Sequence, residues 1–433
     1  MRARMEFAAL LALLLLALSG SAAAAQGLTM GTMNGWTFTF SGNVNAFLAY
    51  TDPKCGGAAA GSTQCDFNGS VIPTGTYEKV LRIRTGLAPA FAIFEAKGKE
   101  GDLDLGVHFG LAPEIQTPYQ FHDNCGGYGG CGAQLDIREV YLTAGGSWGQ
   151  VLAGRALGLY QGQNLLTDMT VYGFGLSGGG SGIFGNGNGT TLGHTGTGYT
   201  YPNFNAQMTY STSASKPGVF SVGLFDPSVV YAGGESFPGT QTPRLEASFV
   251  WTKRTGVSGS ADKLMLYASG LLANVKHSNP VGIQKSSVTP YGIAGGVEWN
   301  RGAFQVDGSG FWQSGVGMTL MFDDGSATDA VGNPRTSYGV LLQGQYMFKS
   351  AKWKIGASYG LNHLDQTSYD TSPSSCDGPC DFVKYNSAFV LSGTYMWTKS
   401  LRWVVEYTYG ASASWDDVKI TSNQGALGMM LFF

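Results

Sequence analysis

The chain has 433 residues, of which 26 are Lys or Arg and 29 are Asp or Glu, and its formal net charge is −3 at pH 7. Charged residues make up 13% of the chain, against about 25% in ordinary soluble domains, and 66 Gly residues disfavour a mainly helical protein. Because the charge is nearly balanced and forms no basic stripe, the composition argues against nucleic acid as a partner.

The N-terminus has the three parts of a secretory signal peptide. A basic "MRAR" precedes the apolar run "FAALLALLLLAL", and "SGSAAAA" supplies the small residues of a cleavage site. The apolar run is shorter than the roughly 20 residues of a spanning helix, so an uncleaved anchor is the weaker alternative. We therefore predict a signal peptide over residues 1–25, cleaved on export, and a mature domain over residues 26–433.

Alternation of apolar and polar residues begins at Trp36 and recurs to the end of the chain. In residues 36–50 the even positions are mostly Trp, Phe, Val, Leu and Tyr, whereas the odd positions begin with Thr, Ser and Asn. A period of two is typical of a strand with one apolar face. We predict about sixteen strands. Their ranges are 36–50, 79–97, 101–113, 134–145, 148–156, 199–213, 218–227, 242–254, 262–275, 289–300, 302–315, 335–349, 351–363, 384–398, 400–411 and 422–433.

The connections between these strands alternate between short turns and long polar or Gly-rich loops. This is the layout of a bacterial outer-membrane barrel, with short periplasmic turns and long extracellular loops. No later segment approaches about 18 uninterrupted apolar residues, so strands rather than helices would cross the membrane. The predicted fold is all-β, a transmembrane antiparallel β-barrel. A soluble β-sandwich is the alternative, which the unbroken strand count and the size of the apolar face disfavour.

Six cysteines fall in three close pairs within the long loops. An even count after a signal peptide is typical of disulfides in an oxidising compartment. His122 lies near the second pair, but the spacings fit no zinc ribbon or zinc finger, so metal binding is the lesser alternative. The predicted disulfides join Cys55 to Cys65, Cys125 to Cys131, and Cys376 to Cys380.

The connection over residues 156–198 differs from the others in length and composition. It has some forty residues and few charges, and it begins apolar and continues into a Gly-rich stretch. This is long for a structureless connection in a compact protein. We predict that the segment folds into the lumen, where its first part, with Asp168, narrows the pore.

The chain ends in "NQGALGMMLFF", which is apolar at every second position. Leu427, Met429, Leu431 and Phe433 would face lipid on a last strand that pairs with the first strand, because an open sheet edge is not tolerated in hydrocarbon. Aromatic residues near strand ends predict two interfacial girdles. These are Trp36, Tyr50, Trp299, Trp312, Trp397 and Tyr409.

The stretch "LDIREVYLTAGGSWGQVLAGRALGLYQGQNLLTDMTVYG" resembles a segment of the trimeric Gram-negative general porins. In that family two strands lead through a Gly-Arg pair into the third loop, which folds inward as the constriction. The C-terminal Phe on an alternating strand is similar to the family's assembly signal. The resemblance implies a homotrimer in outer-membrane lipid, inserted by the barrel-assembly machinery through a signal formed by Phe433, Leu431 and Met429.

The resemblance also implies a pore constriction between an acidic loop position and a basic wall. Asp168 in "LLTDM" takes the acidic position, and Arg138 and Arg84 take basic positions. Arg82 shares the strand face of Arg84, so periodicity supports its place on the same wall. Arg155 either lines the pore or holds the loop. No second carboxylate follows Asp168 in the loop, which weakens the expected field across the pore.

The polar face of the strands is expected to line the interior. A barrel of about sixteen strands leaves an aqueous channel, and mixed charges suit a conduit for small polar solutes. With Arg138 inward, alternation places Glu139 outward, where another subunit accommodates a carboxylate better than lipid does; the alternative is that Glu139 lies in the headgroup region. The predicted lumen-lining residues are Asp104, His108, Arg244, Glu246, Glu298, Asp307, Lys354, Arg402 and Glu406.

We therefore expect an outer-membrane porin, a water-filled channel for passive diffusion of small hydrophilic solutes and ions, without catalytic residues, cofactor or metal. The alternatives are a substrate-selective outer-membrane channel and a structural or adhesive barrel whose long loop plugs the lumen. An outer-membrane hydrolase would need a Ser and a His close together on the lipid side, and the predicted strands bring no such pair together.

Overall fold

The computed structural model describes the chain in stretches. The predicted signal peptide, His122 of the alternative metal site and five of the six cysteines lie outside these stretches. The signal peptide, the metal site and the pairing of the cysteines therefore stay predictions. Cys55 lies within the described stretches and is disulfide-bonded. The described residues are 27–56, 67–72, 79–115, 135–178, 190–215, 217–227, 230–232, 235–237, 242–254, 262–276, 284–322, 325–372 and 382–433.

Within the described stretches, strands account for nearly all the regular structure, together with one short helix, α2 (Gly162–Thr167). Two small hairpins lie outside the main sheet, β10 (Val230–Ala232) with β11 (Glu235–Phe237) and β14 (Val275–Lys276) with β15 (Ser287–Val288). The main sheet contains β1 (Leu28–Met33), β2 (Trp36–Cys55), β3 (Val80–Arg84), β4 (Phe91–Glu100), β5 (Leu103–Pro113), β6 (Leu135–Gly146), β7 (Gly149–Leu157), β8 (Phe204–Ser211), β9 (Gly218–Phe225), β12 (Arg244–Arg254), β13 (Lys263–Leu272), β16 (Tyr291–Arg301), β17 (Phe304–Ser314), β18 (Thr336–Met347), β19 (Trp353–Leu364), β20 (Val383–Met396), β21 (Leu401–Ser414) and β22 (Lys419–Phe432).

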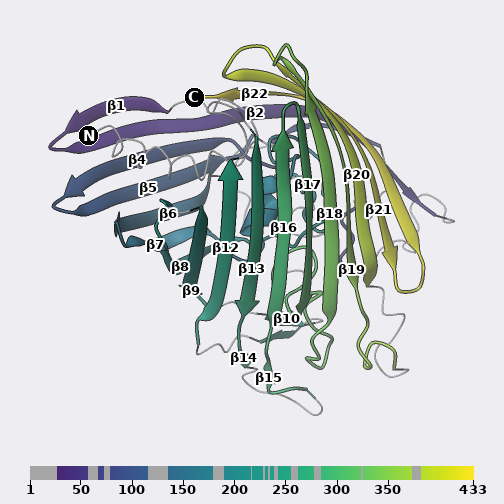
Figure 1. The fold of residues 1–433 in the computed structure, drawn as a ribbon. Coiled ribbons are helices and arrows are strands. Elements are labelled where there is room, and N and C mark those ends of the chain that lie inside the picture. Colours follow the sequence, from purple (N-terminus) through teal and green to yellow (C-terminus); the bar gives the residue numbers. More distant parts are fainter. Residues whose placement is uncertain are drawn as a thin grey trace, which may run out of the picture.

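The main sheet of 18 strands closes on itself as an antiparallel barrel. β2 pairs with β22 on one edge and with β3 and β4 on the other. β1 continues the line of β22 along β2, and β3 and β4 share one line, so the 18 strands occupy sixteen positions around the wall. Figure 1 shows the wall curving from purple β2 through green to yellow β22, which returns beside β2. The predicted barrel of about sixteen strands is confirmed.

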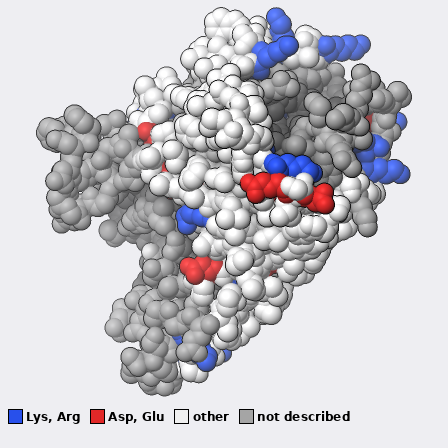
Figure 2. Space-filling model, turned by 90° about the vertical axis from the view of Figure 1, so that its left-hand side faces the viewer, with Lys and Arg blue, Asp and Glu red and all other residues white. Residues whose placement is uncertain are grey.

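Side chains alternate between an outer and an inner face of the wall. Along β2, Val44 and Leu48 are 52% and 46% exposed, whereas Asn45 and Phe47 are 2% and 0% exposed. Uncharged residues, drawn in white, outnumber charged ones among the described residues of the face shown in Figure 2. Among the described residues, no helix has the length and hydropathy of a membrane span. The predicted girdle residues with large exposed side chains are Tyr50, Trp299, Trp312, Trp397 and Tyr409.

The last strand seals the barrel as its alternation predicts. Leu427, Met429 and Leu431 are exposed on the outer face, and Met430 is buried on the inner face. Phe433 follows the strand, where its N–H donates to Gly42 O at 3.1 Å and its carbonyl accepts from Gly42 N at 2.8 Å. The Phe433 ring lies 5.0 Å from the ring of Phe40.

The wall is interrupted where a single strand is predicted over residues 79–97. Asn43 of β2 pairs with Phe91 and Phe47 pairs with Arg84, so only three residues of β2 face the six residues 85–90. The surplus chain cannot stay in register and leaves the sheet. It turns inward, where Leu87 N donates to Gly173 O at 3.2 Å and Ala88 N donates to Val171 O at 3.0 Å. Here the wall supplies a backbone edge to a loop inside the barrel.

Deleting Phe433 should lower the yield of folded barrel, because the deletion removes two backbone hydrogen bonds and an aromatic contact at the seam between the first and last strands. The measurement is the fraction of heat-modifiable protein in outer-membrane preparations. Leu427→Met, a volume-conserving change on the same strand, is the control and should leave that fraction unchanged. A deletion variant with normal yield would contradict the prediction.

Candidate functional site

The connection from β7 to β8 folds back inside the barrel, as predicted for residues 156–198. We call its described residues, 158–178 and 190–203, the constriction loop. It is almost entirely covered, since Tyr160, Thr170, Leu176 and His194 are each at most 1% exposed. A loop so deeply buried must find partners for its backbone polar groups.

One wall carboxylate holds the beginning of the constriction loop. Glu246 Oε2, on β12, accepts the N–H groups of Leu159 and Tyr160 at 2.8 and 2.9 Å. Its other oxygen accepts from Arg244 Nε at 2.7 Å. Glu246 is 0% exposed. It points inward as predicted, but the loop covers it.

A second wall carboxylate holds the middle of the loop. Glu406 Oε2, on β21, accepts the N–H groups of Phe174 and Gly175 at 2.8 and 2.7 Å, and Glu406 Oε1 accepts from Ser392 Oγ at 3.1 Å. Glu406 therefore anchors the loop instead of facing open water.

Wall amides complete the attachment. Gln343 on β18 accepts from Met169 N at 2.6 Å and donates to Thr167 O at 3.0 Å. Gln424 on β22 accepts from Ser177 N at 2.8 Å. These contacts come from strands on different sides of the barrel, so the loop spans the lumen and does not rest against one wall.

Two other connections between strands pack against the constriction loop inside the barrel. Val71 and Ile72, from the connection between β2 and β3, and Met318, from that between β17 and β18, form one buried apolar cluster with Leu176 and Leu192. The lumen is therefore less uniformly wet than the sequence predicts. Inward aromatic side chains are also more numerous than predicted. They include Phe47, Phe225, Tyr267 and Phe311.

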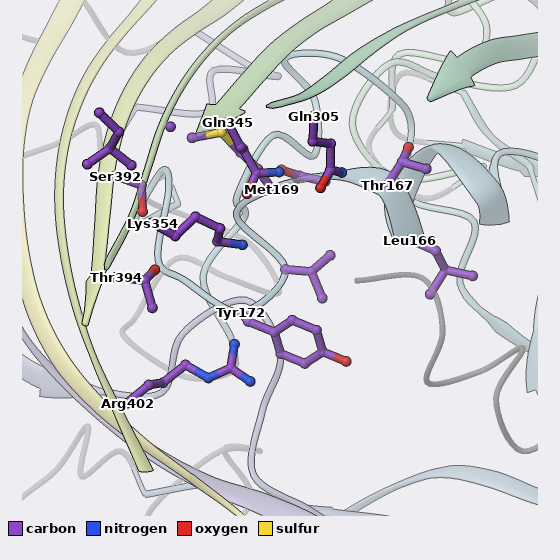
Figure 3. Close-up of a pocket in the computed structure, with 14 residues that line it drawn as sticks. Leu166, Thr167, Met169, Tyr172, Gln305, Gln345, Lys354, Ser392, Thr394 and Arg402 are labelled. Atoms are coloured by element: carbon purple, nitrogen blue, oxygen red, sulfur yellow. The ribbon is translucent and has the colours of Figure 1, made fainter. Parts of the chain in front are cut away.

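A small opening remains between the loop and the wall (Figure 3). Lys354 on β19 and Arg402 on β21 extend into it toward Tyr172 of the loop. The Arg402 guanidinium lies 5.5 Å from the Tyr172 ring and 4.0 Å from the Phe432 ring. The cavity measures about 40 Å³, which holds only a few water molecules. Its walls also include Leu166, Thr167, Asp168, Met169, Val171, Gln305, Gln345, Ile355, Gly356, Ser392 and Thr394.

Asp168 borders this opening, yet its carboxylate is occupied by the loop itself. Oδ1 accepts from the N–H and hydroxyl of Thr170 at 2.8 and 2.7 Å. Oδ2 accepts from His194 N at 3.1 Å and from the hydroxyl of Tyr199 at 2.8 Å. Asp168 is 3% exposed. It joins the two described parts of the constriction loop while its charge stays beside the opening.

The arginines of the expected basic wall lie elsewhere. Arg84 is buried and donates to the carbonyls of Ser177 and Thr190 at 3.1 and 3.3 Å, so it holds the loop. Arg82 pairs in register with Ala49 on the inner face and is exposed, nearer the long-loop end of the wall. Neither residue lines the opening.

A bulge in β6 reverses the expected direction of Glu139. Gly110 pairs with Glu139 and Leu111 with Ile137, so Arg138 is an extra residue. A bulge shifts the alternation by one residue. Glu139 therefore points inward, and the expectation that it faces another subunit was wrong. Its Oε2 lies 3.0 Å from His108 Nε2.

The bulge also sets the surroundings of Arg138 and His108. His108 Nδ1 lies 3.2 Å from Glu95 Oε1, so the imidazole is bracketed by two carboxylates on the inner wall. Arg138 donates through Nε to Asp136 at 2.8 Å and lies 5.6 Å from the Phe204 ring. Neither His108 nor Arg138 reaches the opening.

Arg155 lies on the outer face. It pairs in register with Val140 and Ala206, both exposed on that face, and it donates to Ile137 O at 3.2 Å. This placement differs from both roles expected for it, because the residues that point inward on this part of β7 are its neighbours Gly154 and Ala156. Arg155 leaves the set of constriction residues.

The remaining predicted lumen residues form local contacts along the wall. Glu298 and Asp307 pair in register on β16 and β17, and Glu298 lies 2.7 Å from Lys263 Nζ. Asp104 is exposed near a short turn, where it lies 3.3 Å from Lys99 Nζ. Alternation predicts that these side chains point inward. Alternation does not predict their position along the barrel axis, and this position decides which side chains a passing solute contacts.

His194 is the titratable group at the centre of the constriction loop. Its Nε2 lies 2.7 Å from Ser358 Oγ on β19, and its Nδ1 lies 3.3 Å from Thr197 Oγ1. Burial lowers the pKa of His194 below its ordinary value of 6.5, and the charge of Asp168 opposes that shift in part. The loop is therefore built around a neutral imidazole.

Comparison with known proteins agrees with this architecture. The family model described as Gram-negative porin matches residues 9–412. No curated protein matches the chain. The outer membrane channel DcaP of Acinetobacter baumannii is similar, with a TM-score of 0.63 and 15% identity over 94% of this chain and 99% of that one. OmpF of Salmonella typhi, solved with daunomycin, has a TM-score of 0.54 and 14% identity over 93% and 100%. OmpT of Vibrio cholerae has a TM-score of 0.51 and 14% identity over 94% and 100%.

Glu406→Ala should loosen the constriction loop, because two buried N–H groups lose their acceptor and each costs about 1–3 kcal/mol when unpaired. We expect single-channel current in a planar bilayer to rise by about twofold or more and to become noisier. Asp104→Ala removes an inward carboxylate that does not touch the loop and serves as the control. Identical traces for Glu406→Ala and the unmodified protein would show that the loop is held without Glu406.

Acidification should also loosen the loop. Because the folded pKa of His194 lies below 6.5, the stability linked to its neutral form is present above pH 6.5 and is lost as pH falls through the folded pKa. We expect current noise to increase as the pH falls below 6.5 and through the lowered pKa of His194. In His194→Asn, which cannot titrate, this increase should be absent. Equal pH dependence in both proteins would assign it to another group.

Proposed function

The chain belongs to the Gram-negative porin family and forms an outer-membrane β-barrel channel for passive diffusion of small hydrophilic solutes and ions, and from this we propose that it is a narrow, anion-preferring channel. In this proposal the constriction is the opening between residues 166–172 and strands β17 to β21. Lys354 and Arg402 are its cations, and Asp168 is its acidic loop residue.

The observation that carries the proposal is a difference between the acidic and the basic side chains around the opening: the carboxylates accept hydrogen bonds from the loop, whereas the cations form no salt bridge within the described part of the chain. The Asp168 carboxylate accepts four hydrogen bonds within the loop. Glu406 accepts two backbone N–H groups. Among the described residues, by contrast, Lys354 and Arg402 form no salt bridge. The charged residues that line the opening are two cations and the single carboxylate of Asp168, and an excess of positive charge raises the local concentration of anions.

The size of the opening favours slow, selective passage. With about 40 Å³ of free volume, a solute larger than a few waters must displace them or push the loop aside. Gln305, Gln345, Ser392 and Thr394 offer hydrogen bonds in place of lost hydration. A substrate-selective channel is therefore the second candidate, and the packing of three loops inside the barrel is the observation that favours it.

The finer features of assembly belong to the proposal as well. We place a signal peptide over residues 1–25, removed on export, and insertion by the barrel-assembly machinery. A homotrimer is supported by the exposed apolar side chains of Leu81, Ile83, Leu135 and Ile137 on the outer face of the early strands. OmpT of Vibrio cholerae, which shares the fold, is described in a trimer form. The family makes the protein a channel, and an enzymatic role has no support in the site.

Single-channel recording of the purified mature protein under a salt gradient tests the conclusion. Small current steps in groups of three with a reversal potential on the anion side are the expected result. A silent bilayer would contradict diffusion and favour a barrel plugged by its loops. Large steps without ion preference would contradict the narrow, charged constriction.

Replacing the two cations should reverse the preference. In Lys354→Gln/Arg402→Gln, we expect the permeability ratio of anion to cation to fall by about threefold or more, because Asp168 is then the only charged residue among the described residues that line the opening. Lys352→Gln removes an exposed lysine near the same strand but outside the opening, and should leave the ratio unchanged. If the double variant keeps the original reversal potential, selectivity is set elsewhere.

A further inference from the structure

The outer face of the barrel carries a hollow of about 420 Å³ on strands β19 to β22. These strands lie side by side at the green and yellow end of the wall (Figure 1). We propose that this hollow binds the phosphorylated headgroup of an outer-leaflet lipid. The proposal rests on the barrel lying in the outer membrane and is independent of the constriction. The hollow is lined by Tyr359, Leu361, His363, Tyr385, Ser387, Phe389, Tyr409, Ala411 and Lys419.

The strand register explains the shape of the hollow. Ser387 pairs with Leu361 on one side and with Ala411 on the other, so two small residues, Ser387 and Ala411, lie side by side in its floor next to Leu361. One rung toward the membrane interior, Tyr359, Phe389 and Tyr409 pair across the three strands and stand 46%, 36% and 38% exposed. Large side chains around small ones leave a concavity that a flat lipid-facing wall does not have.

The hollow lies near the outer end of the wall. His363 is close to the end of β19, Tyr385 is close to the beginning of β20, and Lys419 begins β22. The connections at this end of the barrel include the long loops, which are extracellular in such barrels. The hollow therefore sits at the level of the outer-leaflet headgroups, where aromatic girdles also lie.

Two lysines supply positive charge at the rim. Lys419 is exposed, and Lys54 on β2 is exposed on the same outer face, where it pairs with Thr421. This register puts the two lysines at diagonal positions, about 7–8 Å apart between Cα atoms. Among the described residues neither lysine forms a salt bridge, and Asp52, two residues along β2, is the carboxylate on their face.

Lys384 and His363, also near the rim, each have a carboxylate partner. Lys384 Nζ lies 3.0 Å from Asp417, and His363 Nδ1 lies 3.3 Å from Asp365. The free cations thus lie on one side of an aromatic hollow. A lipid would fit each part of this surface. Its phosphate would lie between Lys419 and Lys54, its sugar ring would pack against the tyrosines, and its acyl chain would extend past Tyr359 and Phe389.

A lipid fits this surface better than a second copy of the chain. Two copies that met through this face would bring their unpaired lysines together, and like charges across an interface are costly. A concave surface also needs a protruding partner. A lipid chain supplies one, and its phosphate neutralises both lysines.

Native mass spectrometry of the folded, full-length mature protein tests the proposal, with diphosphorylated lipid A as the probe and its dephosphorylated form for comparison. We expect a retained adduct with the diphosphorylated probe. In Lys419→Gln/Lys54→Gln, binding should weaken by about tenfold or more. Ser387→Trp should also abolish the adduct, because it fills the floor and leaves both lysines in place.

The control is Lys384→Gln, which changes a lysine next to Tyr385 that is already paired with Asp417 and does not line the hollow. It should bind like the unmodified protein. Heat-modifiable migration and an unchanged single-channel current confirm that each variant is folded. Equal binding by all variants, equal binding of the dephosphorylated probe, or full competition by inorganic phosphate alone would overturn the proposal. So would a change in oligomeric state in Ser387→Trp with no change in lipid binding.

Discussion

Every backbone N–H and C=O group in this protein must find a partner in a place where water is scarce, and this requirement governs both the wall and what it encloses. In hydrocarbon the requirement is met by closing the sheet, from β22 back to β2. Inside the barrel it is met by side chains. Glu246 and Glu406 each accept two consecutive N–H groups of the constriction loop, and Gln343 and Gln424 pair with others.

The same requirement divides the charges of the lumen into two groups. Carboxylates such as Asp168 and Glu406 are occupied by backbone and hydroxyl donors, and Arg84 is occupied by loop carbonyls. A charge held in this way stabilises the loop and contributes little directional contact to a solute. Lys354 and Arg402 remain to face the opening. In the proposed function, loop stability and ion selectivity thus depend on different residues of one polar face.

Two irregularities in the early wall connect it to the lumen. Residues 85–90 leave the sheet and give the constriction loop a backbone edge, and the bulge at Arg138 turns Glu139 inward beside His108. Both occur where one strand carries more residues than its neighbour. The later strands, β12 to β22, pair in continuous register except for a shift between Val383 and Tyr385 at the start of β20, and the wall residues that hold the loop there do so through side chains.

The sequence alone determined the barrel, the direction of the last strand and the inward loop, because a period of two in apolar residues is a local property that lipid exposure imposes on every strand. It also determined that Glu246, Glu406, Lys354 and Arg402 point inward. Only the tertiary structure decided which of them anchor the loop and which line the opening, and that Arg155 and Glu139 face opposite to expectation. The position of a side chain along the barrel axis depends on residues that are distant in sequence, and so do register shifts and loop contacts. Alternation is a local pattern and does not encode them.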